Sequence, residues 1–502
     1  MTLIDYINAT KSLMIAAAGH GKTHAIAECI QLCSLGKPQL ILTHTHAGIA
    51  SIKTKLTEMN VDNKKYHVET ITSFVQRYVL AFCRKDDLPE PSEKEYFDAV
   101  LQKGAKLFEN KHVLDVVSLT YDGLFVDEYQ DCTIGQHVIL MKIGEVLPIH
   151  LFGDELQGIF GFAGRLVDFN LDLDGFERFD LLKKPWRWYK EGNCQELGNR
   201  ILKWREILES ENKQFALATD RDAGIEVCIT ASEALSYDNA YFVALRKIIQ
   251  KYDCESLLIL FPSYKEEKWT QKGKVELFRG RISDRIKIKD YIDFSNRFLL
   301  AEAIDDRSFY ANAKSIDELI KNIKRARKKE KNIYDLLDGL SFNKTDLDMW
   351  FDRNHDCRLI NKRGEGKSKS EELASIYQDF IERPSKSLIL KMMTFFMKDA
   401  GIKPKRYEVV SSLVSCLKNF PDEDISVYDS MKEIRNAVRR GGRKIHGRCI
   451  GTTLLTKGLE FDTVIVLDAH RFEDSKNFYV AISRACKNLI ILSKKQTLHF
   501  TK

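Results

Sequence analysis

Short apolar runs alternate with helix-length amphipathic stretches in the first part of the chain. This alternation predicts a parallel sheet covered by helices on both faces. The stretch THAIAECIQLCSLG (23–36) predicts a helix that ends in a glycine C-cap, and a charged segment at 84–118 predicts a small helical insertion. Buried strands are expected at SLMIAAA (12–18), PQLILTHT (38–45), YHVET (66–70), LFVDE (124–128) and PIHLFGDE (148–155).

A second pattern of the same kind begins after residue 190. Its strands are expected at SLLILFPS (256–263), CIGTTLL (449–455), TVIVLDA (463–469) and NLIILS (488–493). Residues 280–425 predict a large helical insertion, with amphipathic helices at IKDYIDFSNRFLLAEAI (288–304) and SLILKMMTFFMKDAG (387–401). The chain therefore divides into a first lobe (1–83 and 119–190) with insertion 84–118, and a second lobe (191–279 and 426–502) with insertion 280–425.

Composition narrows the class only slightly. No run of eighteen apolar residues occurs and the N-terminus lacks the features of a signal peptide, so we expect a cytoplasmic protein without a membrane segment. Eleven cysteines lack the paired spacing of a zinc or iron–sulfur site, which favours reduced thiols. A net charge of +6 permits a polyanionic partner, and the basic runs at 321–331, 362–369 and 439–444 are either solvated faces or binding surfaces.

The segment AAAGHGKT (16–23) lies between a predicted strand and a predicted helix, where a glycine-rich loop cradles phosphates. Lys22 would reach the β and γ oxygens of a nucleotide, and Thr23 would hold Mg²⁺. The alternative is a glycine-capped loop without a ligand, because Ala16 stands where the strict pattern has glycine. The nucleotide-binding residues expected here are Ala16, Ala17, Ala18, Gly19, His20, Gly21, Lys22, Thr23 and His24.

Two further segments end predicted strands with polar residues. In LFVDEYQD (124–131), Asp127 would organise the metal and Glu128 would accept the proton of an attacking water; an acidic turn is the alternative. In LFGDELQGIFGF (151–162), Asp154 and Gln157 are candidates for sensing a γ-phosphate or ordering water. Phe160 and Phe162 in the same segment are either stacking faces for bases or core residues.

The ordered segments AAAGHGKT, THTH, TITSF, DEYQD, GDELQGIFGF, PWRW, TKGLEFD and YVAISRA resemble the motifs of the UvrD/Rep-type superfamily 1 DNA helicases. The matches run from Ala16 to Ala485 and frame nearly the whole chain. The resemblance implies an α/β fold of two RecA-like P-loop lobes, each a parallel sheet flanked by helices and each with a helical insertion. It also implies hydrolysis of ATP with Mg²⁺ and movement from 3′ to 5′ along DNA.

The resemblance implies roles for single residues. Arg187 in PWRW and Arg484 in AISRA would contact the γ-phosphate, since guanidinium groups match the charge that spreads over its oxygens in the transition state. Glu460 would contact the ribose, and Gly458 would lie near the nucleotide. The expected catalytic set is Lys22, Thr23, Asp127, Glu128, Gln157, Arg187 and Arg484, with Thr23 and Asp127 at the metal. The expected DNA contacts are Thr45, His46, Ser73, Phe74, Phe160, Phe162 and Thr453.

The chain also departs from the family pattern. No glutamine precedes the phosphate loop to read adenine, and His44, His46 and Ala47 stand where the family has aromatic, Asn and Lys residues that grip DNA. The first insertion is much smaller than in the large family members. This reduced outline resembles the helicase-like subunit of the Gabija anti-phage system, which accompanies an OLD-type nuclease with an ATPase and a Toprim domain.

Several functions remain open from the sequence. The chain is either a DNA helicase or translocase that acts on single-stranded or end-bearing DNA with a nuclease subunit in antiviral defence, or a DNA-end sensor that activates a nuclease with little unwinding. A nucleotide-binding module without catalysis would have lost Lys22, Glu128 or Arg484, and all three are present. The residues of the motifs favour DNA over RNA as the nucleic acid on which the chain acts.

Overall fold

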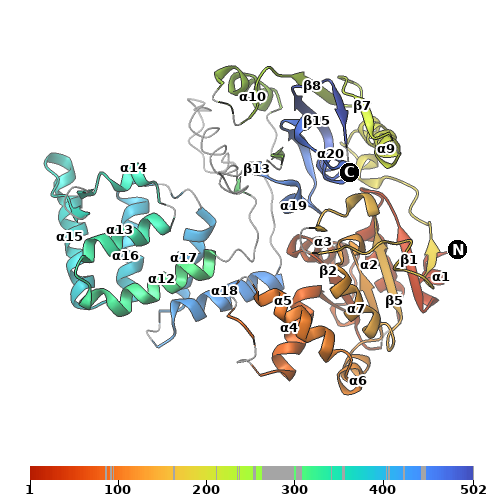
Figure 1. Cartoon of the computed structure of the whole chain (residues 1–502), viewed down its shortest axis with the longest axis horizontal. Coiled ribbons are helices and arrows are strands. Elements are labelled where there is room, and N and C mark those ends of the chain that lie inside the picture. The colour runs from red at the N-terminus through yellow and green to blue at the C-terminus, as the bar shows by residue number, and fades with distance from the viewer. Residues whose placement is uncertain are drawn as a thin grey trace. The chain divides into compact units, whose positions relative to one another are not determined.

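The computed structural model describes residues 1–34, 36–84, 88–90, 93, 95–161, 164–210, 212–234, 236, 238–252, 256–262, 299–300, 308–340, 342–352, 357–402, 404, 407–421, 424–441 and 448–500. The chain forms two compact units. Unit 1 comprises Met1–Leu88, Phe97–Glu302 and Arg440–Lys502, and unit 2 comprises Pro89–Tyr96 and Ala303–Arg439. Unit 1 contains two parallel sheets with their helices, which we call the first and second lobes (Figure 1).

The sheet of the first lobe has six parallel strands. In spatial order they are β3 (Tyr66–Thr70), β2 (Gln39–Thr43), β4 (Gly123–Val126), β5 (Ile149–Gly153), β1 (Lys11–Ile15) and β6 (Glu177–Phe179). Strands β2, β4 and β5 are buried along their whole length, as expected for continuous apolar runs covered on both faces. The five strands predicted from the apolar runs are confirmed, while β6 was not predicted.

Helices cover the first sheet. They are α1 (Leu3–Asn8), α2 (Lys22–Leu32), α3 (His46–Glu58), α4 (Ile71–Phe82), α5 (Tyr96–Leu107), α6 (Lys111–Thr120) and α7 (Ile134–Ile143). Helix α2 ends at Leu32 with Cys33 as its C-cap, so the predicted glycine C-cap is wrong. Its last carbonyls are satisfied instead by Lys65, whose ammonium donates to the oxygens of Gln31 (2.9 Å) and Cys33 (2.6 Å).

The sheet of the second lobe is also parallel. Its order is β10 (Leu299–Leu300), β13 (Arg448–Gly451), β9 (Leu257–Leu260), β14 (Phe461–Val466), β15 (Ala485–Ser493) and β8 (Ile225–Ile229). Side chains of β9 alternate between two cores. Leu257 and Ile259 join the core of α10 (Asn239–Lys251), whereas Leu258 and Leu260 join that of α9 (Gln195–Glu209) and α20 (Ser475–Ile482). The two parallel sheets with flanking helices confirm the predicted α/β fold.

Two predictions for the second part of the chain, one in the second lobe and one in its insertion, are wrong in part. The strand expected over 449–455 stops at Gly451, and Thr453–Thr456 is the short helix α19, in which Thr456 Oγ1 donates back to the Thr452 carbonyl (3.0 Å). Of the helix expected over 288–304, the structure describes only Leu299–Leu300, and these form strand β10. The lobe also contains α8 (Trp186–Tyr189) and the antiparallel pair β7 (Gln214–Ala216) and β16 (Thr497–His499).

Unit 2 is a helical body with its own core. It contains α12 (Ser308–Asn322), α13 (Lys329–Gly339), α14 (Lys344–Leu347), α15 (Lys367–Glu382), α16 (Lys386–Lys398), α17 (Tyr407–Asn419) and α18 (Val427–Gly441), with a hairpin of β11 (Phe351–Asp352) and β12 (Arg358–Leu359) (Figure 1). Phe380, Phe396 and Leu413 lie in this core, fully buried. Helix α16 confirms the amphipathic helix predicted at 387–401. None of the helices in the described part of the chain combines the length and the apolar character that crossing a bilayer requires.

Candidate nucleotide-hydrolysis site

The phosphate loop joins β1 to α2 with a backbone that suits anion binding. Gly19 (φ +75°) and Gly21 (φ +85°) adopt left-handed conformations, and Gly21 is the N-cap of the eleven-residue helix α2. The first N–H groups of that helix are therefore aimed out of the loop without helical partners. Lys22 lies against the loop, where its ammonium donates to the carbonyls of Ala16 (2.7 Å) and Ala17 (3.4 Å). Burial lowers the pKa of Lys22, and the charge of Glu128 opposes this shift.

The other nucleotide-binding candidates of the loop differ in exposure. Ala16 and Ala18 are buried, Ala17 is half-buried, and His24 is exposed on the first turn of α2. His20 is buried, with Nδ1 3.1 Å from the Ala18 carbonyl oxygen. Its burial lowers the pKa of the imidazole, which keeps the ring neutral beside Lys22.

Two carboxylates follow β4. Because β1, β4 and β5 are adjacent and parallel, their carboxyl ends meet at one edge of the sheet, which brings Asp127 and Glu128 to the phosphate loop. Glu128 has a left-handed backbone (φ +56°), and its N–H donates to Asp127 Oδ1 (2.9 Å). Burial and the charge of Glu128 raise the pKa of Asp127. Burial opposes ionisation of Glu128 too, but Lys457 and Lys22 outweigh it and lower its pKa.

A pocket opens beside these carboxylates. It is lined by Thr23, His44, Thr45, Gly48, Ser51, Asp127, Glu128, Asp131, Lys457 and Gly458. The Thr23 hydroxyl and the Asp127 carboxylate are hard oxygen donors, and Mg²⁺ bound with nucleotides usually takes only one or two protein carboxylates beside phosphates and water. These donors fit a magnesium–nucleotide complex.

The two arginines expected at the γ-phosphate lie next to the loop. The Arg187 backbone N–H donates to the Gly19 carbonyl (3.0 Å), and its guanidinium donates to Glu460 Oε1 (3.0 Å) and to the Ser483 carbonyl. Arg484 follows α20 and donates through Nη2 to Gln157 Oε1 (3.1 Å) of the first lobe. Burial and the neighbouring Arg187 lower the pKa of Arg484 to about 10, so it remains charged at neutral pH.

Asp154 does not face the site as a phosphate sensor would. Its side chain is 0% exposed, and its two oxygens accept from the guanidinium of Arg205 (2.7 and 2.8 Å). Oδ2 also accepts from the Gln157 amide (2.8 Å). Arg205 and Gln157 engage the carboxylate inside the protein, so the structure does not support Asp154 as a sensor of the γ-phosphate. A role for Gln157 in sensing the γ-phosphate or ordering water stays a prediction.

Two of the expected DNA contacts are core residues. Phe74 is 0% exposed and packs on Phe108 (ring centroids 5.9 Å apart), so it offers no face to a base. Thr453 is buried, and its hydroxyl donates to Asn477 Oδ1 (2.8 Å). Both side chains are engaged inside the described structure, and contact of either with DNA stays a prediction.

Three other DNA candidates, Thr45, Ser73 and Phe160, are half-buried. Thr45 is the N-cap of α3, which begins at His46, and Thr45 Oγ1 accepts from the Gly48 N–H (3.0 Å). Ser73, in the first turn of α4, accepts from the Thr70 hydroxyl (2.8 Å). Phe160 is half-buried, with its ring centroid 6.1 Å from that of His44. Phe162 lies outside the described residues.

Three side chains at the site were missed by the sequence analysis. Trp186 is 52% exposed, and a Cβ on Gly21 would lie 3.3 Å from its indole, which places this aromatic ring at the phosphate loop. Lys457 pairs with Asp131, donates to the Gln157 carbonyl and lies 3.6 Å from Glu128 Oε2. Trp186 could have been proposed from the sequence, because it stands beside Arg187 in the motif PWRW. The third missed residue is Arg205, and the contacts of Lys457 and Arg205 depend on tertiary structure alone.

A strand–loop–helix phosphate cradle, paired carboxylates and two arginines are typical of two-lobed P-loop proteins that hydrolyse nucleotides. Residues 2–163 match a family model described as an AAA domain, and residues 199–496 match the UvrD-like helicase C-terminal domain. The second match spans more than half of the chain. The chain belongs to the UvrD-like helicase family, which confirms the resemblance drawn from its motifs.

Individual relatives share short regions with the chain. It is 23% identical over 225 residues to an ATP-dependent helicase/nuclease subunit of Alkaliphilus metalliredigens (strain QYMF), covering 44% of this chain and 17% of the relative. It is 27% identical over 172 residues to the exonuclease/helicase subunit RexA of Lactococcus lactis subsp. cremoris (strain MG1363), covering 34% and 14%. The matched region is thus less than a fifth of each relative. A crystal structure of the Escherichia coli DEAH/RHA helicase HrpB aligns with a TM-score of 0.28 at 12% identity, over 57% of this chain and 29% of that one.

Proposed function

We propose that this chain is an ATP-dependent DNA helicase or translocase that moves from 3′ to 5′. The observation that carries the proposal is the contact between Arg484 of the second lobe and Gln157 of the first, beside Glu128. An arginine supplied by one lobe to a site on the other links the relative position of the lobes to hydrolysis. Alternating closure and release of the lobes would then drive movement along the strand.

Each residue of the site would have its own role in ATP hydrolysis. Glu128, kept ionised by Lys457 and Lys22, would accept the proton of the attacking water. Lys22, Arg187 and Arg484 would stabilise the charge on the phosphoryl oxygens. Thr23 and Asp127 would hold Mg²⁺, which neutralises phosphate charge when it is bound. Gly458, which lines the pocket, and Glu460, paired with Arg187, would lie along the nucleotide.

Steady-state ATP hydrolysis by the purified chain, with and without single-stranded DNA, tests this proposal. We expect DNA to stimulate hydrolysis strongly and E128Q to abolish it while retaining ATP binding. Glu128→Gln keeps the size of the side chain and removes the base. Hydrolysis by E128Q at the parental rate would contradict the assignment.

A second candidate function is a DNA-end sensor that activates a nuclease with little unwinding of its own. It is favoured by the departures at His44 and His46, and by the relatives that are named as helicase/nuclease subunits. The partner proposed is an OLD-type, Toprim-containing nuclease in a hetero-oligomer that serves antiviral defence. A strand-displacement assay separates the two functions: the motor unwinds a tailed duplex alone, whereas the sensor hydrolyses ATP on DNA without displacement and changes the cleavage rate of the added nuclease.

A further inference from the structure

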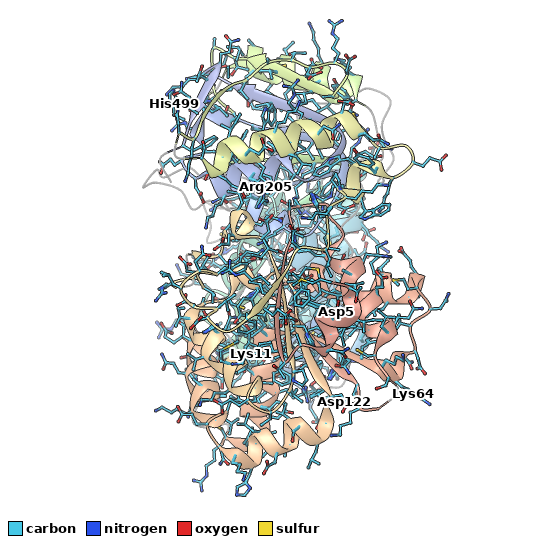
Figure 2. The ribbon with its side chains drawn as sticks, turned by 90° about the vertical axis from the view of Figure 1, so that its right-hand side faces the viewer. Asp5, Lys11, Lys64, Asp122, Arg205 and His499 are labelled. Atoms are coloured by element: carbon cyan, nitrogen blue, oxygen red, sulfur yellow. The ribbon has the colours of Figure 1, made fainter. Side chains whose placement is uncertain are left out.

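A buried ion pair joins the two lobes outside the expected catalytic set. Arg205 lies on α9 of the second lobe, and Asp154 follows β5 of the first. Nη1 and Nη2 of Arg205 donate to the two oxygens of Asp154 at 2.7 and 2.8 Å, which is a bidentate contact. Figure 2 shows Arg205 at the border between the lobes, where 15% of its side chain is exposed.

The pair sets the orientation of the Gln157 side chain. Asp154 Oδ2 accepts from Gln157 Nε2 (2.8 Å), so the amide nitrogen is committed to the carboxylate. The amide oxygen must then face the opposite way, where it accepts from Arg484 Nη2 (3.1 Å). Arg205 and Arg484 are thereby connected through Asp154 and Gln157 in one chain of hydrogen bonds.

The same guanidinium reaches the phosphate loop by a second route. Nη1 of Arg205 donates to the Tyr479 hydroxyl (3.1 Å), and that hydroxyl also accepts from the Ala18 backbone N–H (3.2 Å). Tyr479 lies on α20, the helix that Arg484 follows. The loop that would cradle the phosphates is thus held to the helix next to Arg484.

We propose that Arg205 is a positioning residue for ATP hydrolysis, which holds the Gln157 amide toward Arg484 and holds Ala18 of the phosphate loop against α20 through Tyr479. This inference rests on the proposed roles of Gln157 and Arg484. A buried ion pair usually adds no more net stability than apolar residues of similar volume would, so stability does not explain the presence of the Arg205–Asp154 pair. Its hydrogen bonds to Gln157 and Tyr479 give a better explanation, because both lead to the site.

The experiment compares R205K with R200K in the chain of 502 residues. Arg200 lies on the same helix and pairs with Asp220 at the surface, so it is a matched arginine–aspartate control. A lysine keeps the charge at 205, but as a point charge it cannot hold both carboxylate oxygens and the Tyr479 hydroxyl in one plane. We expect kcat for DNA-stimulated hydrolysis to fall at least tenfold in R205K with KM changed less than threefold, and both constants of R200K to stay within twofold of the parent.

Y479F supplies a test that leaves both charges of the ion pair in place. It removes only the hydroxyl that accepts from Arg205 and from the Ala18 N–H, and we expect kcat to fall at least threefold while the protein stays folded. Parental kcat in folded R205K would overturn the inference. If R205K does not fold, parental kcat in Y479F would overturn it.

E128Q, measured in the same series, separates this inference from the proposed function. An inactive E128Q beside a fully active R205K refutes only the positioning role. Equal rates in the parent and E128Q refute the hydrolysis site itself.

Discussion

At the scale of the residue, the phosphate loop is held in a conformation that only glycine adopts freely at Gly19. An added Cβ there would lie 2.8 Å from Arg187 Cβ and 2.9 Å from the Trp188 ring. Two features therefore disfavour any residue with a Cβ at position 19: the left-handed backbone and the packing of α8 against the loop.

Replacement of Gly19 by alanine should lower both stability and nucleotide affinity. The left-handed backbone costs about 1 kcal/mol for a residue with a Cβ, and the steric clash adds about 1–3 kcal/mol. The G175A variant is the control, because Gly175 has a similar φ (+79°) with no neighbouring atom within 4 Å. Thermal unfolding of both variants measures the difference. Equal losses of stability would show that Arg187 and Trp188 move aside without cost.

A buried histidine predicts how stability depends on pH. His150 lies in the first sheet with Nδ1 2.8 Å from Ser12 Oγ, and burial lowers its pKa to about 4. The unfolded chain takes up this proton near pH 6.5, whereas the folded chain does so only near pH 4. Stability contributed by the neutral ring is thus present above pH 6.5 and is lost as the pH falls toward 4.

The variant H150N retains a polar partner for Ser12 and cannot titrate. Between pH 7 and pH 5 the parent should lose about 2 kcal/mol of unfolding free energy more than H150N does. Denaturant titrations at the two pH values measure both losses. The same loss in both proteins would assign the acid sensitivity to other groups.

At the scale of the element, the sequence revealed which segments form strands but not how the strands are ordered. Runs such as LLIL (257–260) are apolar along their length, so burial on both faces follows from composition. The order β3-β2-β4-β5-β1-β6 depends on crossovers that no local pattern encodes. Likewise, the motifs located Glu128 and Arg484, whereas Arg205 lies in an ordinary amphipathic helix and gains its partner Asp154 only in the folded chain.

Helix α18 of unit 2 is capped by a side chain from a distant helix. Asp317 of α12 accepts from the backbone N–H groups of Val427 (2.8 Å) and Tyr428 (2.9 Å), at the first turn of α18. D317A should destabilise unit 2 by about 1–3 kcal/mol, because it leaves two helix N–H groups without their charged acceptor. The control D338A removes an exposed pair with Lys344 and should cost less than about 1 kcal/mol. Hydrogen exchange at the first turn of α18 should rise only in D317A.

At the scale of the whole molecule, polar contacts connect the two lobes of unit 1 near the site. The Arg187 backbone N–H donates to the Gly19 carbonyl (3.0 Å), Arg205 pairs with Asp154, and Lys457 pairs with Asp131. Directional contacts of this kind form or break with small displacements, whereas apolar contacts fade gradually with distance. These interactions therefore favour two discrete arrangements of the lobes, one in which the polar contacts are formed and one in which they are broken.

R484A should uncouple nucleotide binding from hydrolysis. Arg484 reaches the first lobe through Gln157, while the phosphate loop itself is built from the first lobe. We expect turnover to fall roughly 10³-fold, by analogy with other arginines supplied to a transferring phosphoryl group. Binding of a fluorescent ATP analogue should change much less. Hydrolysis by R484A at the parental rate would contradict the role given to this arginine.

The exposed Trp186 has a spectroscopic consequence. Among the tryptophans that the structure describes, Trp188, Trp204 and Trp350 are buried, so Trp186 alone meets solvent over about half of its surface, and it does so beside Gly21. Its emission should respond to any nucleotide that enters the phosphate loop. The unlabelled protein thus carries its own optical reporter, with which the order of nucleotide and DNA binding can be timed in a stopped-flow instrument.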